Sequence, residues 1–178
     1  ALSKSSKEHG VPIDILIGVL GVESGGNRFA KNKSGALGPM QFLATTAREF
    51  GLTVKKDIDE RTNITKSIDA AAMYLKKLYG YYGQWYIALV AYSTGYSKLD
   101  REIITKFPKI NKTNVHNPEV LQKSGVNMVT LYSKCFSFLG KYHPFQYPIW
   151  VSAMAPFVAN NIREGEKAEI KKYNHVYK

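Results

Sequence analysis

One acidic residue lies in a setting that could tune it for catalysis. Glu23 follows a run from Ile13 to Val22 that is apolar on nearly every face, and Gly25 and Gly26 should end that helix. Partial burial and the negative end of the helix dipole both disfavour the ionised carboxylate, so both should raise the pKa of Glu23. A carboxyl group with a pKa of roughly 6 can protonate a glycosidic leaving oxygen. Taken alone, however, a glutamate at a helix end is more often an ordinary surface residue.

Cysteine and histidine offer weaker candidates. Cys135 is the only cysteine, which excludes a disulfide within the chain and a zinc site built on several thiolates. None of the histidines shows the paired spacing of a zinc peptidase. They are His9, His116, His143 and His175. Cys135 with His143 is too weak a hint for a thiol peptidase, so a peptidase stays only an alternative.

The elements that must position Glu23 are predicted to be helices. Helical spacing of apolar residues indicates helices at 12–24, 40–50, 65–79, 85–92, 128–139 and 159–172. Loops are expected at 27–39 and 107–118, and the stretch 142–148 carries two prolines and three aromatic residues. The sequence contains no internal repeat, no low-complexity segment and no convincing pair of alternating strands. We therefore predict a mainly α fold in one globular domain, residues 1–178.

Charge and hydropathy narrow the class of partner. The 178 residues carry a net charge of +11, which favours a polyanion such as nucleic acid, an anionic membrane or the acidic bacterial cell wall. The basic residues stand in ones and twos, unlike a disordered nucleic-acid-binding arm, and a solvated basic surface explains them equally well. The apolar stretch Ile149–Ala159 is interrupted by Pro156 and has about half the length needed to cross a bilayer. We expect no transmembrane segment and a soluble protein.

Four motifs in order resemble the soluble lytic transglycosylases, whose lysozyme-like relatives include goose-type lysozyme. The resemblance covers residues 10–100. Its motifs are Glu23-Ser24-Gly25-Gly26-Asn27; Ser34-Gly35-Ala36-Leu37-Gly38-Pro39-Met40-Gln41 followed by Thr46-Ala47; Asn63-Ile64; and Ala88-Leu89-Val90-Ala91-Tyr92-Ser93-Thr94-Gly95. The resemblance implies a lysozyme-like fold and Glu23 as the catalytic residue.

The same resemblance implies roles for residues that bind the substrate. Ser24 would hold a sugar N-acetyl group or steady Glu23, although a serine after a helix end is often a simple cap. Gly38 would let the backbone pass close to a bound sugar. Tyr92 resembles the tyrosine that faces the catalytic glutamate, with a core aromatic as the alternative. The remaining candidates are Met40 and Gln41, which would begin the helix that floors the cleft or be merely structural, together with Ser93 and Tyr132.

The sequence departs from the family pattern at several points. Pro39 replaces the usual Leu and Ser93 the usual Asn, so hydrogen bonding at the rim of the site should differ. After Gly95 the resemblance fades, and Tyr132 is a weak candidate for the tyrosine that the family supplies from a later helix. Residues 141–178 have no counterpart, and we expect them to form a C-terminal extension that packs on the domain or lines the cleft.

The acidic residues favour one reaction route over another. Glycoside hydrolases normally use two carboxylates, but no Asp or Glu occurs between Ser24 and Arg48, where goose-type enzymes carry their extra acids. We therefore expect Glu23 to be the sole acid/base in lytic transglycosylation at the MurNAc–GlcNAc bond of peptidoglycan. The route that the resemblance implies needs no metal and no cofactor. A muramidase or murein endopeptidase stays an alternative, as does a non-catalytic glycan-binding or virion-structural module.

The expected partner is the peptidoglycan glycan strand rather than nucleic acid, and we expect a monomer. The N-terminus shows no signal-peptide pattern, although a processed chain would also lack one. High basic charge and the lack of a lipid-anchor cysteine near the start favour a secreted, periplasmic or phage-borne lysin, the last carried in the virion.

Overall fold

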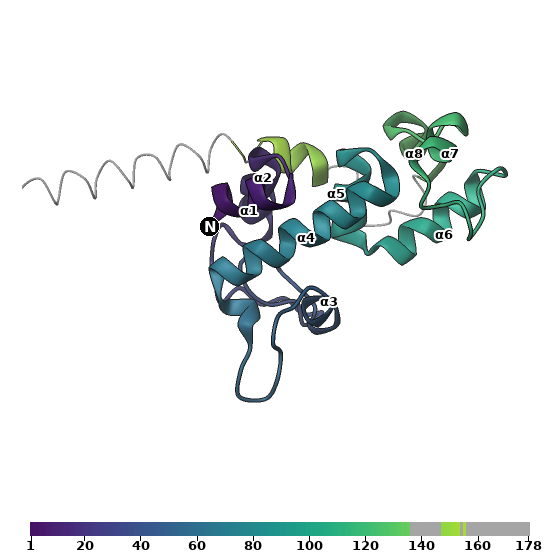
Figure 1. The fold of residues 1–178 in the computed structure, drawn as a ribbon. Coiled ribbons are helices and arrows are strands. Elements are labelled where there is room, and N and C mark those ends of the chain that lie inside the picture. The colour runs from purple at the N-terminus through teal and green to yellow at the C-terminus, as the bar shows by residue number, and fades with distance from the viewer. Residues whose placement is uncertain (136–146, 154, 156–178) are drawn as a thin grey trace, which may run out of the picture.

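The computed structural model describes residues 1–135, 147–153 and 155 (Figure 1). Within these residues the chain is helical, and its only β pairs are isolated bridges between single residues. The prediction of a mainly α fold is confirmed. The elements are α1 (Leu2–His9), α2 (Ile13–Ser24), α3 (Ala44–Glu49), the 3₁₀ turn η1 (Glu60–Thr62), α4 (Ile64–Tyr82), α5 (Trp85–Thr94), α6 (Tyr96–Lys106), α7 (Pro118–Lys123) and α8 (Met128–Cys135).

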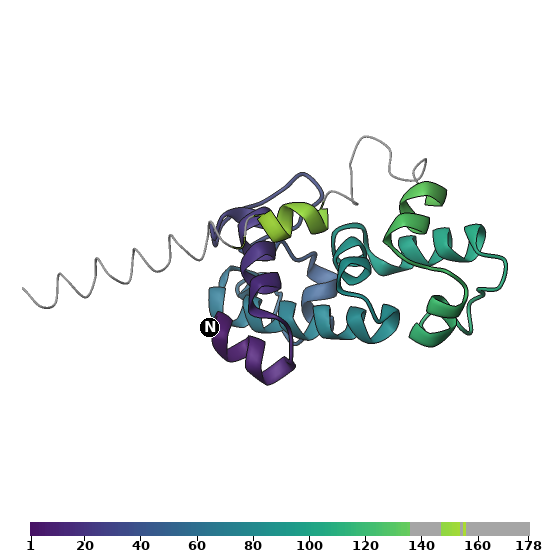
Figure 2. The ribbon, with the colours of Figure 1, turned by 90° about the horizontal axis from the view of Figure 1, so that it is seen from above.

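Helix α4 is the longest element; α1, α2, α5 and α7 pack against it, whereas α6 packs on α5 and α8 beyond one end of it (Figures 1 and 2). Helix α4 begins where the Asn63 side chain accepts the N–H of Lys66, which satisfies one of the free donors of its first turn. Its alanine-rich face, which includes Ala70, Ala71 and Ala72, is buried. Small side chains there let α5 pack closely, and α1 and α2 lie against the N-terminal half of α4.

Helices α2 and α5 are apolar throughout, as the sequence predicts. Residues 16–21 of α2 and 87–91 of α5 are buried on successive positions rather than on one stripe, which places both helices in the core. Helix α2 ends at Gly25, which adopts a left-handed φ of 61°, and α5 ends at Gly95 with a φ of 84°. Both breaks lie where the sequence places them.

The predicted helix at 40–50 is wrong in its first turn. Helix α3 begins only at Ala44, and Met40 and Gln41 belong to the preceding turn. Gln41 has a φ of 51°, which no right-handed helix permits, and Phe42 forms an antiparallel bridge with Leu37. Tertiary pairing of this loop therefore overrides the helical spacing of its side chains.

Several helices lie where no helix was expected. Helix α1 precedes the first predicted element, α6 follows Gly95 directly, and α7 begins at Pro118 under the cap of the Asn117 side chain. Of the predicted helix 128–139, the described part is α8. The predicted closing helix 159–172 lies outside the described residues. None of the described helices is both long and apolar enough to cross a membrane.

A short helical segment at 147–153 lies beside α2 (Figures 1 and 2). Its inner residues Tyr147 and Val151, one turn apart, are buried. A Cβ atom on Gly18 would lie 2.1 Å from the carbonyl oxygen of Val151, so the two backbones pack at a separation that only glycine permits. Gly18 thus brings the end of the described chain against the helix that carries Glu23.

Candidate active site

Glu23 lies in a pocket at the meeting point of three parts of the chain, which we call the Glu23 pocket. The last turn of α2 supplies Glu23, the 32–46 stretch forms one wall, and α4 and α5 form the other. The pocket is lined by Glu23, Asn32, Ser34, Ala36, Gln41, Phe42, Leu43, Thr46, Tyr74, Tyr92, Ser93, Thr94 and Gly95. Of the site residues predicted from the sequence, this pocket gathers Glu23, Gln41, Tyr92 and Ser93.

The carboxyl group of Glu23 has an altered protonation equilibrium. Burial raises its pKa from 4.5 to about 7, because the anion loses hydration that the pocket does not replace. The hydroxyl of Tyr147 donates a hydrogen bond of 2.5 Å to Oε1, which acts in the opposite direction by favouring the anion. The carboxyl group is therefore poised to exchange a proton near neutral pH, as an acid/base catalyst requires.

Tyr147 is the functional residue that sequence reasoning missed. It comes 124 positions after Glu23, from the aromatic stretch left unaligned, and its hydroxyl reaches the carboxyl group directly. Tyr132, the candidate from the sequence, lies on α8, is 51% exposed and does not line the Glu23 pocket. The cluster of aromatic residues between 142 and 150 was the available signal, but nothing in it distinguished Tyr147 from its neighbours.

Tyr92 forms the wall of the pocket on the α5 side. Its hydroxyl donates a 2.8 Å hydrogen bond to the carbonyl oxygen of Met40, and its ring packs against Phe42 and Tyr74. Burial and the nearby Glu23 carboxylate both raise the pKa of Tyr92, so it stays a neutral donor. Tyr92 thereby ties α5 to the turn at Met40 beside the carboxyl group.

The hydroxyl of Ser24 is used within the protein. It donates a 2.8 Å hydrogen bond to the carbonyl oxygen of Pro39 and accepts the N–H of Gly26 at 3.0 Å. This pattern joins the end of α2 to the loop that forms the opposite wall. The geometry supports a role in positioning that loop, and Ser24 itself does not line the Glu23 pocket.

Position 38 needs a glycine because the backbone of Arg61 packs against it, not because a bound sugar would pass beside it. Its φ is 87°, and a Cβ atom there would lie 1.9 Å from the carbonyl oxygen of Arg61. Arg61, which is 9% exposed, donates from its guanidinium to the carbonyl oxygens of Gly35 and Phe42 and pairs with Asp59. Sequence reasoning missed Arg61, because a lone arginine before Asn63 gives no sign of its partners.

The other predicted binding residues divide between the core and the rim. Met40 is fully buried and acts as a core residue. The amide nitrogen of Gln41 donates to the carbonyl oxygens of Ala30 and Gly38, both at 2.9 Å, and so holds the turn. Ser93 lines the pocket and donates to the carbonyl oxygen of Val90 at 3.1 Å. In the described structure, these polar groups mainly order the walls.

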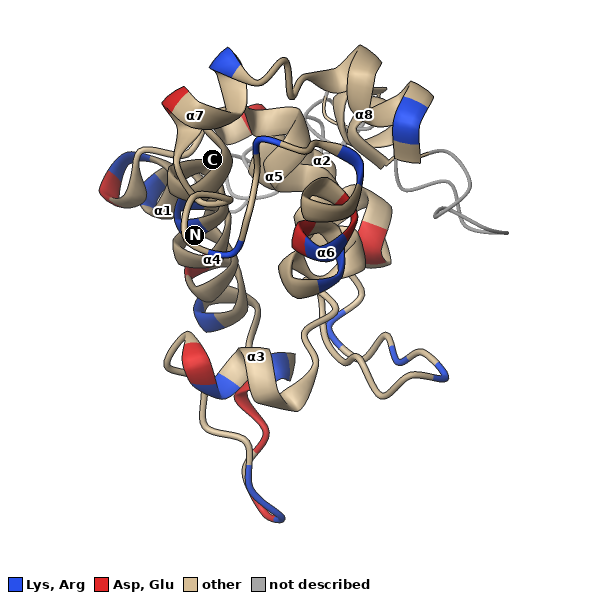
Figure 3. Cartoon of the chain, turned by 90° about the vertical axis from the view of Figure 1, so that its right-hand side faces the viewer, with Lys and Arg blue, Asp and Glu red and all other residues tan. Residues whose placement is uncertain are grey.

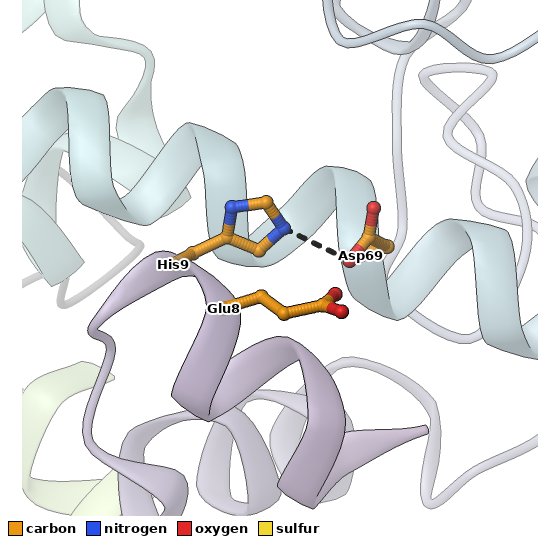
Figure 4. A group of neighbouring side chains, drawn as sticks. All are labelled: Glu8, His9 and Asp69. Carbon is orange, nitrogen blue, oxygen red and sulfur yellow. Dashed lines mark hydrogen bonds and ion pairs between the residues drawn. The ribbon is translucent and has the colours of Figure 1, made fainter.

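One group of side chains has the composition of a metal site, but it lies on another face. Ligand atoms of Glu8, His9 and Asp69 lie within 4.8 Å of one another between α1 and α4 (Figure 4). His9 Nε2 contacts Asp69 Oδ1 at 2.9 Å, and Ser5 donates to the same oxygen. Exposed Glu8 also pairs with Lys4. These bonds account for the group as a link between helices.

Two comparisons with known proteins agree with this geometry. The family model described as Transglycosylase SLT domain matches residues 1–114. The chain is also similar to the peptidoglycan transglycosylase gp16 of Escherichia phage T7, with 36% identity over 108 residues. That alignment covers 60% of this chain and 8% of the phage protein, so the chain spans a small part of its relative's length. The matched stretch contains Glu23 and every residue lining its pocket but not Tyr147.

Proposed function

The chain belongs to the transglycosylase SLT domain family, and we propose that it cleaves peptidoglycan glycan strands by lytic transglycosylation with Glu23 as the sole acid/base. The observation that carries this proposal is the pairing of one buried carboxyl group, of pKa about 7, with a pocket that has no other acidic lining among the described residues. The bond proposed is the one between MurNAc and GlcNAc.

In the first step, Glu23 acts as the acid. Its proton passes to the oxygen that links the two sugars while the bond from that oxygen to the muramic C1 breaks. The N-acetyl group of the muramic residue stabilises the positive charge that develops at C1. The raised pKa supports this step, because a carboxyl group with a pKa of about 7 arrives protonated and still releases its proton.

In the second step, the resulting carboxylate acts as the base. It takes the proton of the muramic 6-hydroxyl as that oxygen bonds to C1 and closes an anhydro ring, which returns Glu23 to its protonated form. The Tyr147 hydroxyl favours the carboxylate between the two steps, whereas burial favours the protonated form before and after them. The balance of these two influences is what lets one residue serve both steps.

The number of acidic residues favours this route over hydrolysis. Glycoside hydrolases of either stereochemical type normally use a second carboxylate roughly 5 to 9.5 Å from the acid. Among the described residues, Glu23 alone provides a carboxylate to the pocket lining. With the nucleophile supplied by the substrate's own 6-hydroxyl, no second acid is needed.

Mass spectrometry of the fragments released from purified peptidoglycan tests the proposal. We expect anhydromuramic ends from the wild-type protein. Reducing muramic ends would instead indicate a muramidase, and new peptide amines an endopeptidase. Glu119→Gln is the matched control for Glu23→Gln, because Glu119 is exposed on α7 and makes only a 3.9 Å surface pair with Lys123.

The place of action follows from the proposed substrate. Peptidoglycan lies outside the cytoplasmic membrane, so we propose that the protein acts as a monomer in a secreted or periplasmic setting or from a phage particle. The similarity to a phage protein supports the last of these. Fractionation of infected or producing cells, with detection of the protein in particles, periplasm and medium, distinguishes the three.

A further inference from the structure

A second pocket opens between α6 and the segment that follows it. We call it the α6 pocket. Helix α6 buries Leu99 and Ile103 in the core, and its opposite face, which carries Ser97, Arg101 and Thr105, lines this pocket. Lys112 and His116 complete it from the connecting segment. Figure 3, in which this end faces the viewer, shows Lys and Arg residues on α6 and along the connecting segment.

The cations of the α6 pocket have no anionic partner among the described residues. Neither Arg101 nor Lys112 forms an ion pair or a side-chain hydrogen bond there, although other lysines of the chain, such as Lys66 and Lys77, do pair. A guanidinium group offers donors in a fork that matches a carboxylate, and a lysine adds a mobile positive charge. The pocket therefore suits an anion.

Among the described residues that line this pocket, Asp100 alone is acidic, and it is already bonded to protein partners. Asp100 accepts the hydroxyl of Tyr82 at 2.7 Å and contacts His116 Nε2 at 2.8 Å, so both of its oxygens are bonded. Its side chain is 14% exposed. The ring of His116 also stacks on Tyr81, with centroids 3.8 Å apart and planes 3° apart. These contacts fix one wall of the pocket and keep the acid turned into the structure.

The α6 pocket and the Glu23 pocket are adjacent along the chain, because α6 begins directly after Gly95. Gly95 lines the Glu23 pocket, and the next residue, Tyr96, packs edge-on against Tyr81 and His116. From Gly95 to Arg101 the helix advances by about 9 Å at 1.5 Å per residue. Arg101 therefore lies within two turns of Gly95, on the helix that begins at the edge of the Glu23 pocket.

We propose that the α6 pocket binds the carboxylates of the peptide stems carried by the glycan strand. The inference rests on the proposed function, since a glycan held at Glu23 brings its own acidic peptides to this position. Arg101 would pair with a carboxylate, Lys112 would add a second positive contact, and Ser97 would donate a hydrogen bond. The pocket then makes the enzyme favour peptide-bearing strands over bare glycan.

Binding measured without cleavage tests the proposal. A synthetic stem tripeptide with free carboxylates is titrated into the wild-type protein and followed by amide chemical shifts in NMR. We expect the shifts to map to α6 and the 112–116 segment, and the same tripeptide with its carboxylates amidated to cause none. Equal binding of both peptides, or shifts elsewhere on the surface, would overturn the proposal.

Matched variants sharpen the test. The double variant Arg101→Gln/Lys112→Gln should bind the acidic tripeptide about three- to tenfold more weakly, a modest loss because both side chains are solvent-exposed. The double variant Lys55→Gln/Lys56→Gln removes the same charge from an exposed loop and should bind like the wild type. Unchanged binding in the first variant, or an equal loss in the second, would refute a specific site.

Activity on two substrates separates this inference from the proposed function. Relative to wild type, Arg101→Gln/Lys112→Gln should raise KM for peptide-bearing glycan and leave both kcat and the cleavage of peptide-free glycan unchanged. If the wild type releases anhydromuramic ends but the variant keeps the wild-type KM for peptide-bearing glycan, the inference fails and the function stands. If the wild type cleaves neither substrate but binds the acidic peptide at α6, the function fails and the pocket stands.

Discussion

Two carboxyl groups of this fold each accept a hydrogen bond from a buried tyrosine, yet their surroundings differ. Asp100 has both oxygens bonded, to Tyr82 and to His116, and it links α6 to α4 and to the connecting segment. Glu23 has one bond, from Tyr147, and makes no other hydrogen bond with a described residue. The two acids differ in the number of their hydrogen-bond partners rather than in the presence of a tyrosine: Asp100 links elements of the fold, whereas Glu23 is the proposed acid/base.

The single partner leaves Glu23 free to change its protonation state. Burial opposes the anion and is offset only in part, which gives a pKa of about 7, and one side of the group faces the pocket. A second donor would have held the carboxylate in place and favoured its anionic form. The incomplete bonding of Glu23 is thus the condition for its proposed chemistry, and the following experiments test that condition.

The largest expected effect is that of Glu23→Gln on cleavage. The amide keeps the size of the side chain but cannot give up a proton, so we expect the rate of anhydromuramic product formation to fall by about 10³-fold. Circular dichroism should show an unchanged fold. A variant that retained wild-type activity would contradict the role of Glu23, and Glu119→Gln should behave like the wild type throughout.

The second effect concerns stability and its dependence on pH. Because burial raises the folded-state pKa of Glu23 above its unfolded value of 4.5, the folded protein binds the extra proton between pH 4.5 and about 7. The stabilisation that this proton gives is fully present below pH 4.5. The free energy of unfolding then falls by on the order of 2 to 3 kcal/mol as the pH rises from 4.5 to about 7. Denaturant unfolding at pH 5 and pH 8 measures this difference.

Glu23→Gln provides the control for that measurement. Since the amide does not titrate, the variant should lack this part of the fall in unfolding free energy between pH 5 and pH 8. Identical pH dependence in the two proteins would show that Glu23 is hydrated and ordinary in the folded state.

The third effect is that of Tyr147→Phe, which removes the hydrogen bond that Tyr147 donates to Glu23. The bond favours the carboxylate, so its loss should move the pKa of Glu23 above about 7 and shift the alkaline limb of the rate profile to higher pH. We also expect kcat to fall by about tenfold, because the base formed in the first step loses its donor. The measurement is a profile of kcat and KM against pH.

A purely structural role for Tyr147 would predict a different result. Activity would then fall together with stability, and the alkaline limb would stay at the wild-type pH. The position of that limb is therefore the reading that decides between the two roles.

The smallest effect is that of Tyr82→Phe, the matching change at the other tyrosine–carboxyl pair. Asp100 keeps its bond to His116, so we expect a loss of about 1 kcal/mol in unfolding free energy and no change in kcat or its pH profile. Denaturant unfolding and the same kinetic profile check both points. A shift in the pH profile would show that the two pairs do not differ as described.

The sequence predicts the part of the site that depends on nearby residues. The apolar run of α2 with its glycine stop places Glu23 correctly at the end of a buried helix, and the Ser93–Gly95 break ends α5 where predicted. Both features follow from local hydropathy and from the conformational freedom of glycine. The fold class follows for the same reason.

The features that the sequence does not predict depend mainly on contacts between residues far apart in the chain. The Arg61 guanidinium orders the loop from Gly35 to Phe42 through carbonyl oxygens, and no side-chain pattern records such bonds. Tyr147 can bond to Glu23 because its segment packs closely against the backbone at Gly18. No pattern in the sequence indicates that these two segments are in contact. Helix α6 has buried positions only at Leu99 and Ile103, too few to stand out as a periodic stripe.

The contact at Gly18 also bears on when the protein becomes active during its synthesis. Residues 1–95 contain Glu23 and the whole lining of its pocket, and they leave the ribosome before Tyr147, which comes 52 positions after Gly95. Domains fold as the chain emerges at about 5 to 20 residues per second, so the pocket can form several seconds before its tyrosine arrives. The hydrogen bond then closes across 124 positions, the kind of distant contact that forms late in folding. On the proposed function, the site would reach its full rate only once this bond has closed.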